Sequence, residues 1–189
     1  MSYITYNKHI KSNAKYISRF LAIIILGFLM LPVIASAIGS TVVPEISEAR
    51  LKIPEIGVDA VIKNMGVTSE GAMAVPNNNI DVGLFSFGTQ PGEKGTAVIG
   101  AHNQLNSKPG VFARLDEIKK GDILSVINTS GTSIYFIVRD IRTYDALDTD
   151  TGIFESVNGI HLNLITCSGT WDSKTKSHTK RLVIFTDAI

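Results

Sequence analysis

The sequence of 189 residues contains a single cysteine, few aromatic residues (7%) and no large surplus of either charge. One cysteine excludes an intramolecular disulfide. It also excludes a zinc site built from thiolates, because such sites use two to four cysteines. The formal net charge is +1, and the first twenty residues hold four of the bases and no acid. The remaining 14 bases and 17 acids give residues 21–189 a net charge of −3. Nucleic-acid binding needs a clustered basic surface, so we expect no nucleic-acid partner.

Repeats and compositional bias are also missing. The 16 glycines and 6 prolines follow no period, which excludes a collagen-like chain. A composition that is 44% hydrophobic and 19% charged is typical of a folded protein, and it excludes a disordered tail protein and a long coiled coil. The length is sufficient for one domain with its own core.

An apolar segment without charge covers residues 20–38. Nineteen helical residues rise about 28 Å, close to the hydrocarbon thickness of roughly 30 Å. The basic residues 1–19 before the segment are expected to stay in the cytoplasm, which places everything after Ile38 outside the cell. The sequence therefore predicts a single-pass protein of the cell membrane with an extracytoplasmic domain.

The same segment allows a second interpretation, in which it is a cleaved signal peptide. Its most apolar block, Phe20 to Leu31, is short, and Ala35-Ser36-Ala37 fits a cleavage site. An uncleaved signal anchor is favoured because residues 33–38 continue the apolar run. Both alternatives export the domain. Residues 39–49 are interpreted as a linker that leads into a domain over residues 50–189.

From Arg50 onward, short β-branched or apolar runs alternate with clusters of Gly, Pro, Asn and Asp. This pattern predicts an all-β domain, an antiparallel sandwich or barrel. The expected strand segments are 51–53, 56–58, 71–75, 96–99, 123–127, 134–138, 161–167 and 181–185. A turn at Asn128 to Gly131 predicts a hairpin. One short helix is expected over residues 111–119, and a loop over residues 168–180.

The only cysteine, Cys167, ends the expected strand 161–167. A strand end can hold a side chain rigidly and let it reach a cleft. Most free cysteines are small buried hydrophobic residues, which is the alternative here. In an exported chain, however, a single thiol is vulnerable to oxidation unless it is buried or used. A nucleophilic thiol needs a partner that favours the thiolate.

Four histidines are candidates for that partner. His9 lies in the basic cytoplasmic segment, and His161 lies six residues from Cys167 on the same strand, about 20 Å away. His178 falls in a Lys-rich loop, where we expect it to face solvent. His102 follows an apolar strand and opens a polar loop, so it also lies at a strand end.

Arg181 opens the final expected strand, fourteen residues after Cys167. If the two strands are neighbours, Arg181 lies beside Cys167. A guanidinium there can bind a developing oxyanion, because it is always charged and donates in a fork. The alternative is an edge-strand arginine that hinders aggregation.

Together these residues resemble the sortase family. The segment Asn163-Leu164-Ile165-Thr166-Cys167 is similar to the family motif T-L-x-T-C, with Asn in the first place. Val98-Ile99-Gly100-Ala101-His102 is similar to the family's strand-end Gly-His, with Ala directly before the histidine. Arg181 and the four residues after it match the family's arginine strand. The resemblance covers about residues 50–187 and the membrane segment, and it is nearest to the class E and F branches.

The resemblance implies a sortase-type closed β-barrel, usually eight-stranded, with short helices. It implies a cysteine transpeptidase that cleaves a C-terminal L-P-x-T-G-like sorting signal of surface proteins. Cys167 would attack the Thr–Gly carbonyl to form a thioacyl enzyme, His102 would move protons, and Arg181 would steady the oxyanion. The acceptor would be an amine of a cell wall precursor or of a pilin. No cofactor or metal is expected, and the substrate-binding residues are not identified.

Two other functions are possible for an exported protein with one cysteine. An L,D-transpeptidase carries a Ser-His-Gly-Cys-type motif, whereas Ile165-Thr166 precede Cys167 here. An exported binding or adhesin module without catalysis predicts a buried Cys167 far from His102 and Arg181.

Two further residues and an acidic cluster bear on the orientation of His102 and on calcium binding. Asn103 and Asp145 are candidates for orienting His102. The acidic cluster Asp148, Asp150 and Glu155 is interpreted as a solvated loop rather than a calcium site.

Overall fold

The computed structural model describes residues 48–69, 71–148, 152–155 and 157–189. These residues belong to one compact unit, Val42–Ile189. The predicted cytoplasmic segment, with His9, and the predicted membrane segment lie outside the described residues. Among the residues that are described, no helix is both long and apolar enough to cross a membrane.

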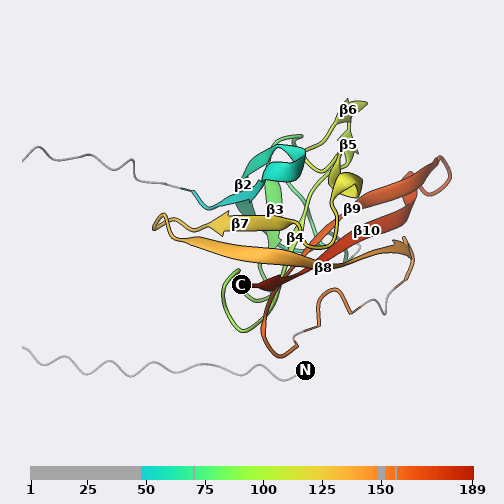
Figure 1. The fold of residues 1–189 in the computed structure, drawn as a ribbon. Coiled ribbons are helices and arrows are strands. Elements are labelled where there is room, and N and C mark those ends of the chain that lie inside the picture. The colour runs from blue at the N-terminus through green and yellow to red at the C-terminus, as the bar shows by residue number, and fades with distance from the viewer. Residues whose placement is uncertain (1–47, 70, 149–151, 156) are drawn as a thin grey trace, which may run out of the picture. The chain divides into compact units, whose positions relative to one another are not determined.

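Eight strands close into a barrel in the order β1–β2–β3–β4–β9–β10–β8–β7 (Figure 1). The all-β class and the eight-stranded closed barrel are thereby confirmed. A separate two-stranded hairpin is formed by β5 (Gln104–Leu105) and β6 (Lys108–Pro109). The barrel strands are β1 (Arg50–Ile53), β2 (Val58–Met65), β3 (Val82–Phe85), β4 (Gly95–Gly100), β7 (Ile123–Ile127), β8 (Ser133–Asp145), β9 (Ile160–Asp172) and β10 (Ser177–Ala188).

Two strand pairs are parallel, β2 with β3 and β4 with β9, whereas the sequence predicted antiparallel pairing. Alternation of apolar and polar residues reports which face a side chain takes and carries no information on strand direction. The difference matters for the site, because parallel neighbours end at the same edge of a sheet.

The expected helix over residues 111–119 is wrong. Only a 3₁₀ turn, η2 (Leu115–Glu117), forms there, and a second one, η1 (Pro54–Ile56), separates β1 from β2. The buried residues Phe112, Leu115 and Ile118 are spaced by three. A spacing of three matches a 3₁₀ helix, with three residues per turn, and not an α-helix.

Other expected boundaries also shift. Residues 71–75 form no strand beyond an isolated bridge between Val67 and Met73. Most of the expected loop 168–180 is strand, because β9 and β10 continue into a long hairpin that turns at residues 173–176. This hairpin is polar and leaves the barrel, so its strands lack the apolar alternation that reveals a strand in a sequence.

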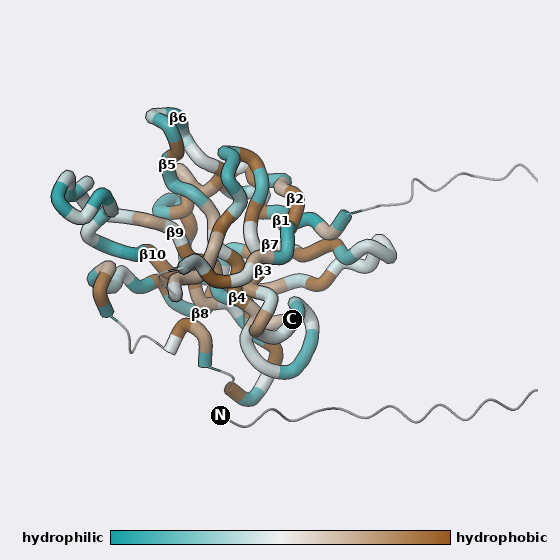
Figure 2. Tube along the Cα trace, turned by 180° about the vertical axis from the view of Figure 1, so that it is seen from behind, coloured by the Kyte–Doolittle hydropathy of each residue, from teal (hydrophilic) through white to brown (hydrophobic). Residues whose placement is uncertain are grey.

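Side chains of β9 alternate between two apolar clusters. Leu162 and Leu164 belong to the main core inside the barrel, with Ile99 and Ile184. Ile165 packs on the outer face against a second cluster, formed by Val98, Ile153, Val183 and Phe185. Figure 2 shows the apolar residues concentrated in the barrel strands and polar residues at the hairpin tips. Cys167 has the parity of Ile165 and therefore belongs to the outer face.

Candidate active site

Cys167 and Arg181 lie directly opposite each other in the antiparallel pair of β9 and β10. Residues paired in this way project from the same face of the sheet, with Cα atoms about 4.5–5.5 Å apart. Both side chains are half-buried. The sequence predicted this proximity on the condition that the two strands are neighbours, and the register confirms it.

The sequence predicted that Cys167 ends its strand. This prediction is wrong, because β9 continues to Asp172. The thiol of Cys167 is accessible because of the neighbouring strand on the β4 side of β9. The neighbouring strand β4 ends at Gly100, opposite Ile165. Cys167 therefore has a strand partner on the β10 side only, and its other side adjoins the chain that leaves β4.

His102 lies in that chain, at the level of Cys167. Contact between the two strands continues one residue past β4. There the Ala101 N–H donates to the Ile165 carbonyl at 3.2 Å, and Thr166 Oγ1 donates to the Ala101 carbonyl at 2.8 Å. Ala101 thus stands beside Thr166, and both are buried. The next residue on each strand is His102 on one and Cys167 on the other.

Gly110 and Phe112 hold the backbone of His102 from the loop side. The Phe112 N–H donates to the His102 carbonyl at 3.1 Å. A Cβ on Gly110 would lie 2.1 Å from that carbonyl oxygen and 3.0 Å from the His102 Cβ. Gly110 is therefore required for the close approach of the two backbones. The sequence pattern does not reveal the role of Gly110, because that role depends on a contact across the β5–β6 hairpin.

The Arg181 guanidinium is held by the base of the β9–β10 hairpin. Nη1 donates to the carbonyls of His178 and Lys180, at 2.9 and 2.8 Å, and Nη2 donates to Ser177 Oγ at 3.0 Å. A guanidinium has five N–H donors, so Nε–H and one Nη2–H have no partner among the described residues. These donors are available to a substrate. In the described part of the chain, the Cys167 thiol makes no hydrogen bond with His102 or Arg181.

The other histidines of the described chain do not join this group. His161 Nδ1 lies 2.8 Å from Asp187 Oδ1, and its Nε2 lies 2.7 Å from the Asn158 carbonyl. His178 packs edge-on against Trp171, with ring centroids 5.5 Å apart. It is half-buried, and its Nδ1 lies 3.2 Å from the Gly169 carbonyl, so it is partly open to solvent.

Neither candidate for orienting His102 does so by a hydrogen bond within the described residues. Asp145 Oδ1 accepts from Lys180 Nζ at 2.6 Å, and the Asn103 carbonyl accepts from the Gly110 N–H at 2.7 Å. Over the described ranges, no group of three His, Cys, Asp or Glu residues could hold a metal ion. Asp150 of the acidic cluster lies outside them.

The arrangement contradicts the alternative of a binding module with a buried thiol, which required Arg181 to lie far from Cys167. A half-buried thiol, an imidazole and a guanidinium instead share one edge of the sheet. A thiol next to a base and an oriented cation is the composition of a nucleophilic site for acyl transfer.

Comparisons with known proteins agree with this geometry. Residues 51–189 match the family model of the sortase domain. Sortase C-1 from Actinomyces oris superposes with a TM-score of 0.60 at 24% identity, over 75% of this chain and 73% of that one. Sortase A from Corynebacterium diphtheriae, a lid mutant, gives 0.58 at 20% identity, over 76% and 70%.

A sortase D5 transpeptidase from Clostridium perfringens gives a TM-score of 0.57 at 21% identity, over 76% of this chain and 79% of that one. These structural likenesses show the same fold. No protein of curated function matches the chain. The match to the family model extends over most of the chain and contains all three residues of the candidate site. The chain therefore belongs to the sortase family, whose members are cysteine transpeptidases.

Proposed function

We propose that this protein cleaves a C-terminal L-P-x-T-G-like sorting signal through a thioacyl enzyme and transfers the surface protein to an amine of the cell wall or of a pilin. The observation that supports this proposal most directly is the register that places Arg181 opposite Cys167 while β4 delivers His102 to the same edge. The proposed catalytic residues are Cys167, His102 and Arg181.

In the first step, Cys167 Sγ attacks the carbonyl carbon of the threonine. The Thr–Gly C–N bond breaks, and the glycine amine leaves with a proton from His102, which receives the thiol proton in exchange. In the second step, an incoming amine gives a proton to His102 and attacks the thioester carbon. The C–S bond breaks, the thiol is restored and a new amide bond forms.

Arg181 acts on the carbonyl oxygen in both steps. Negative charge develops on that oxygen in each tetrahedral intermediate, and two N–H groups of the guanidinium have no partner in the part of the chain that the structure describes. Its other donors are used by the hairpin, so the group is oriented before substrate arrives.

The proposed location is the cell membrane, with the domain outside the cytoplasm. The basic residues 1–19 and the apolar residues 20–38 support this location. This location requires the uncleaved anchor. A cleaved signal would export the same domain without the membrane segment, and the mass of the mature protein distinguishes the two. Residues 39–49 serve as the linker, and the class E or F branch is proposed on the resemblance alone.

The test is acyl transfer by the detergent-solubilised full chain. We would incubate it with fluorescent L-P-x-T-G-type peptides and an amine, and follow products and enzyme by mass spectrometry, with Cys167→Ala as the control. A ligated product that depends on Cys167 supports the proposal, and a thioester adduct without product points to a different acceptor. A folded protein without adduct on any of these peptides would contradict the proposal.

A further inference from the structure

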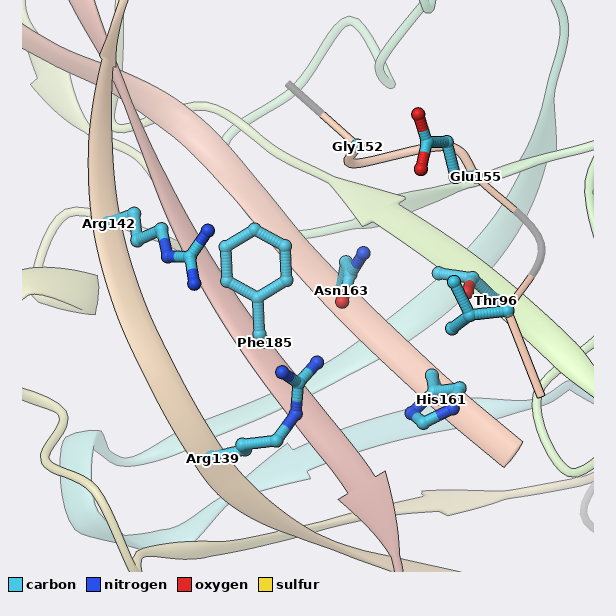
Figure 3. Close-up of a pocket in the computed structure, with 9 residues that line it drawn as sticks. Thr96, Arg139, Arg142, Gly152, Glu155, His161, Asn163 and Phe185 are labelled. Atoms are coloured by element: carbon cyan, nitrogen blue, oxygen red, sulfur yellow. The ribbon is translucent and has the colours of Figure 1, made fainter. Parts of the chain in front are cut away.

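A cavity of about 130 Å³ lies on the outer face of β9, beside His161 and Asn163 near the start of that strand. Figure 3 shows the side chains that line it. Side chains from β4, β8, β9 and β10 line it, together with residues of the β8–β9 connection. This volume is suited to one polar side chain and is well below the roughly 300–1,000 Å³ of a cofactor pocket.

Two arginines reach this cavity because β8 contains a bulge. Residues 139 and 142 would project from opposite faces of a regular strand. The pairing of β8 with β10 shifts between Phe185 and Thr186, which pair with Asp140 and Val138 and leave Arg139 as the extra residue. A bulge of this kind re-aims side chains. Arg139 and Arg142 therefore share the outer face.

The two guanidinium groups flank the ring of Phe185. Their central carbons lie 5.8 Å (Arg139) and 5.3 Å (Arg142) from the ring centroid, and Figure 3 shows both groups pointing toward the ring. Arg139 Nε donates to Asp187 at 3.0 Å, and Arg142 Nε donates to Asp140 at 2.6 Å. The Nη atoms of Arg139 have no hydrogen-bond partner among the described residues. The Arg142 guanidinium also lies beside the Tyr144 hydroxyl, and Tyr144 and Asp140 together raise the pKa of Arg142. Both side chains are thus oriented and keep donors for an anion.

The cavity also contains an acceptor that needs a donor. Asn163 is 2% exposed, and its Nδ2 donates to the Ile153 carbonyl at 2.8 Å. Its Oδ1 is buried with no partner among the described residues. A buried polar atom without a partner is costly, so a ligand that supplies an N–H gains binding energy there. Glu155 adds an exposed carboxylate to the wall. His161, also in the wall, has both ring nitrogens engaged.

These groups together select a particular ligand. The arginines already bind Asp187 and Asp140 through Nε, and their remaining N–H groups can bind a further anionic group. Asn163 Oδ1 and Glu155 can accept N–H donors. A simple inorganic anion such as sulfate carries only acceptors, so it can bind the arginines but offers no N–H to Asn163 Oδ1 or Glu155. An acidic residue within a peptide brings both, because its side chain carries the carboxylate and its backbone carries the N–H.

The distance to Cys167 fits a bound peptide. Asn163 and Cys167 lie on one face of β9, four residues apart, and are paired with Phe185 and Arg181 on β10. Four residues of strand rise about 13 Å, and an extended peptide covers the same distance with the same number of residues. A peptide whose carbonyl is at Cys167 therefore reaches the cavity with a residue four or five positions away.

We propose that this cavity binds the carboxylate of an aspartate or glutamate in the donor polypeptide, four or five residues before the residue that Cys167 acylates. In an L-P-x-T-G-like signal, this is one or two residues before the leucine. The inference rests on the proposed function. The amino-terminal side is assigned because that part stays on the enzyme as the acyl group, whereas the carboxyl-terminal part leaves. A contact on the acyl side therefore acts through both steps.

The experiment compares donor peptides that differ at one residue. The full chain in detergent receives matched peptides with Glu or Gln one or two residues before the leucine, and a third with Glu only after the cleaved bond. We expect kcat/KM for acylation to be about tenfold higher with Glu on the acyl side. Arg139→Gln and Arg142→Gln should bring the Glu-to-Gln ratio close to one. Arg114→Gln is the matched control, because Arg114 is an equally exposed arginine with one carboxylate partner, Glu117, and should keep the ratio.

Equal rates with Glu and Gln would overturn the assignment, as would a preference that survives both arginine substitutions. A preference only for Glu after the cleaved bond would overturn the assigned side. If no peptide acylates Cys167, the proposed function fails, and the cavity is tested without chemistry. Binding of the same peptides to Cys167→Ala, measured by fluorescence anisotropy, then supports the cavity if Glu is preferred and overturns it if Glu and Gln bind equally.

Discussion

The hydroxyl of Thr166 donates to the carbonyl oxygen of Ala101 at 2.8 Å, and this bond joins the residue before Cys167 to the residue before His102. Both groups are buried. Together with the bond from the Ala101 N–H to the Ile165 carbonyl, it fixes the position of the proposed base along the strands relative to the proposed nucleophile.

Thr166→Val tests this connection. The substitution leaves the Ala101 carbonyl without its side-chain donor, which costs about 1–3 kcal/mol of stability. We expect acyl transfer to fall by about tenfold as well, because the imidazole is no longer fixed relative to the thiol. Unfolding by urea and the rate of Cys167 acylation measure the two effects.

Thr186→Val is the matched control for this prediction. Thr186 is also buried and donates to a backbone carbonyl of β9, that of Leu162, at 2.7 Å. It should lose a similar amount of stability and keep its acylation rate. Equal losses of activity in both variants would show that the effect of Thr166 is general rather than local.

Gly110→Ala should impair the site through the backbone. The new methyl group would meet the His102 carbonyl oxygen at 2.1 Å, so the loop must move away from His102. We expect a loss of acyl transfer of at least tenfold, since small displacements of a catalytic group are costly. Gly66→Ala is the control, because its Cβ would meet nothing closer than 3.8 Å. Full activity in Gly110→Ala would remove Gly110 from the positioning of His102.

Arg181→Lys should lose most of the transpeptidase activity although the charge is retained. A lysine cannot donate to the His178 and Lys180 carbonyls and to Ser177 while it also presents a fork to the substrate oxygen. Single-turnover acylation, compared with Arg114→Lys, measures the effect. A folded Arg181→Lys variant with unchanged acylation would contradict the proposed role.

Stability should depend on pH through Asp140. Hydrogen bonds from Lys120 and Arg142 hold the pKa of the Asp140 carboxyl below its ordinary value of 3.8. The folded state therefore keeps this carboxylate ionised at a pH where the unfolded state binds a proton. Its contribution is complete above pH 3.8 and is lost as the pH falls through the lower, folded-state pKa.

Asp140→Asn should accordingly be less stable than the parent at pH 7, and the difference should shrink toward about pH 2. Urea midpoints at the two pH values measure it. If the two variants differ in urea midpoint by the same amount at both pH values, the charge of Asp140 does not contribute to stability through its ion pairs.

Much of the site could be predicted because its residues stand out in the sequence. A single cysteine and a few histidines limit the choices, and each proposed catalytic residue lies beside an apolar run that forms a core strand. The limits of β7 were predicted to the residue, since Leu124 and Val126 alternate toward the core. Where one face of a strand is buried, its pattern is readable.

The remaining features depend on contacts between distant segments. The sequence of β4 or of β9 alone does not indicate that the two strands pair in parallel. Gly110 matters only because the loop passes within contact distance of His102. The shared face of Arg139 and Arg142 depends on a bulge, and a regular two-residue period predicts opposite faces for them. Local pattern does not report such register changes.

The pairing of Arg181 with Cys167 also has a consequence for folding. β10 follows the other barrel strands in the described sequence, and it closes the barrel between β8 and β9. Cys167 and His102 are 65 residues apart in the sequence, so their approach is a non-local contact of the kind that forms slowly. The catalytic edge is thus complete only after the C-terminal strand has paired. We expect no partly folded intermediate to be active, and regain of acylation during refolding should coincide with closure of the barrel.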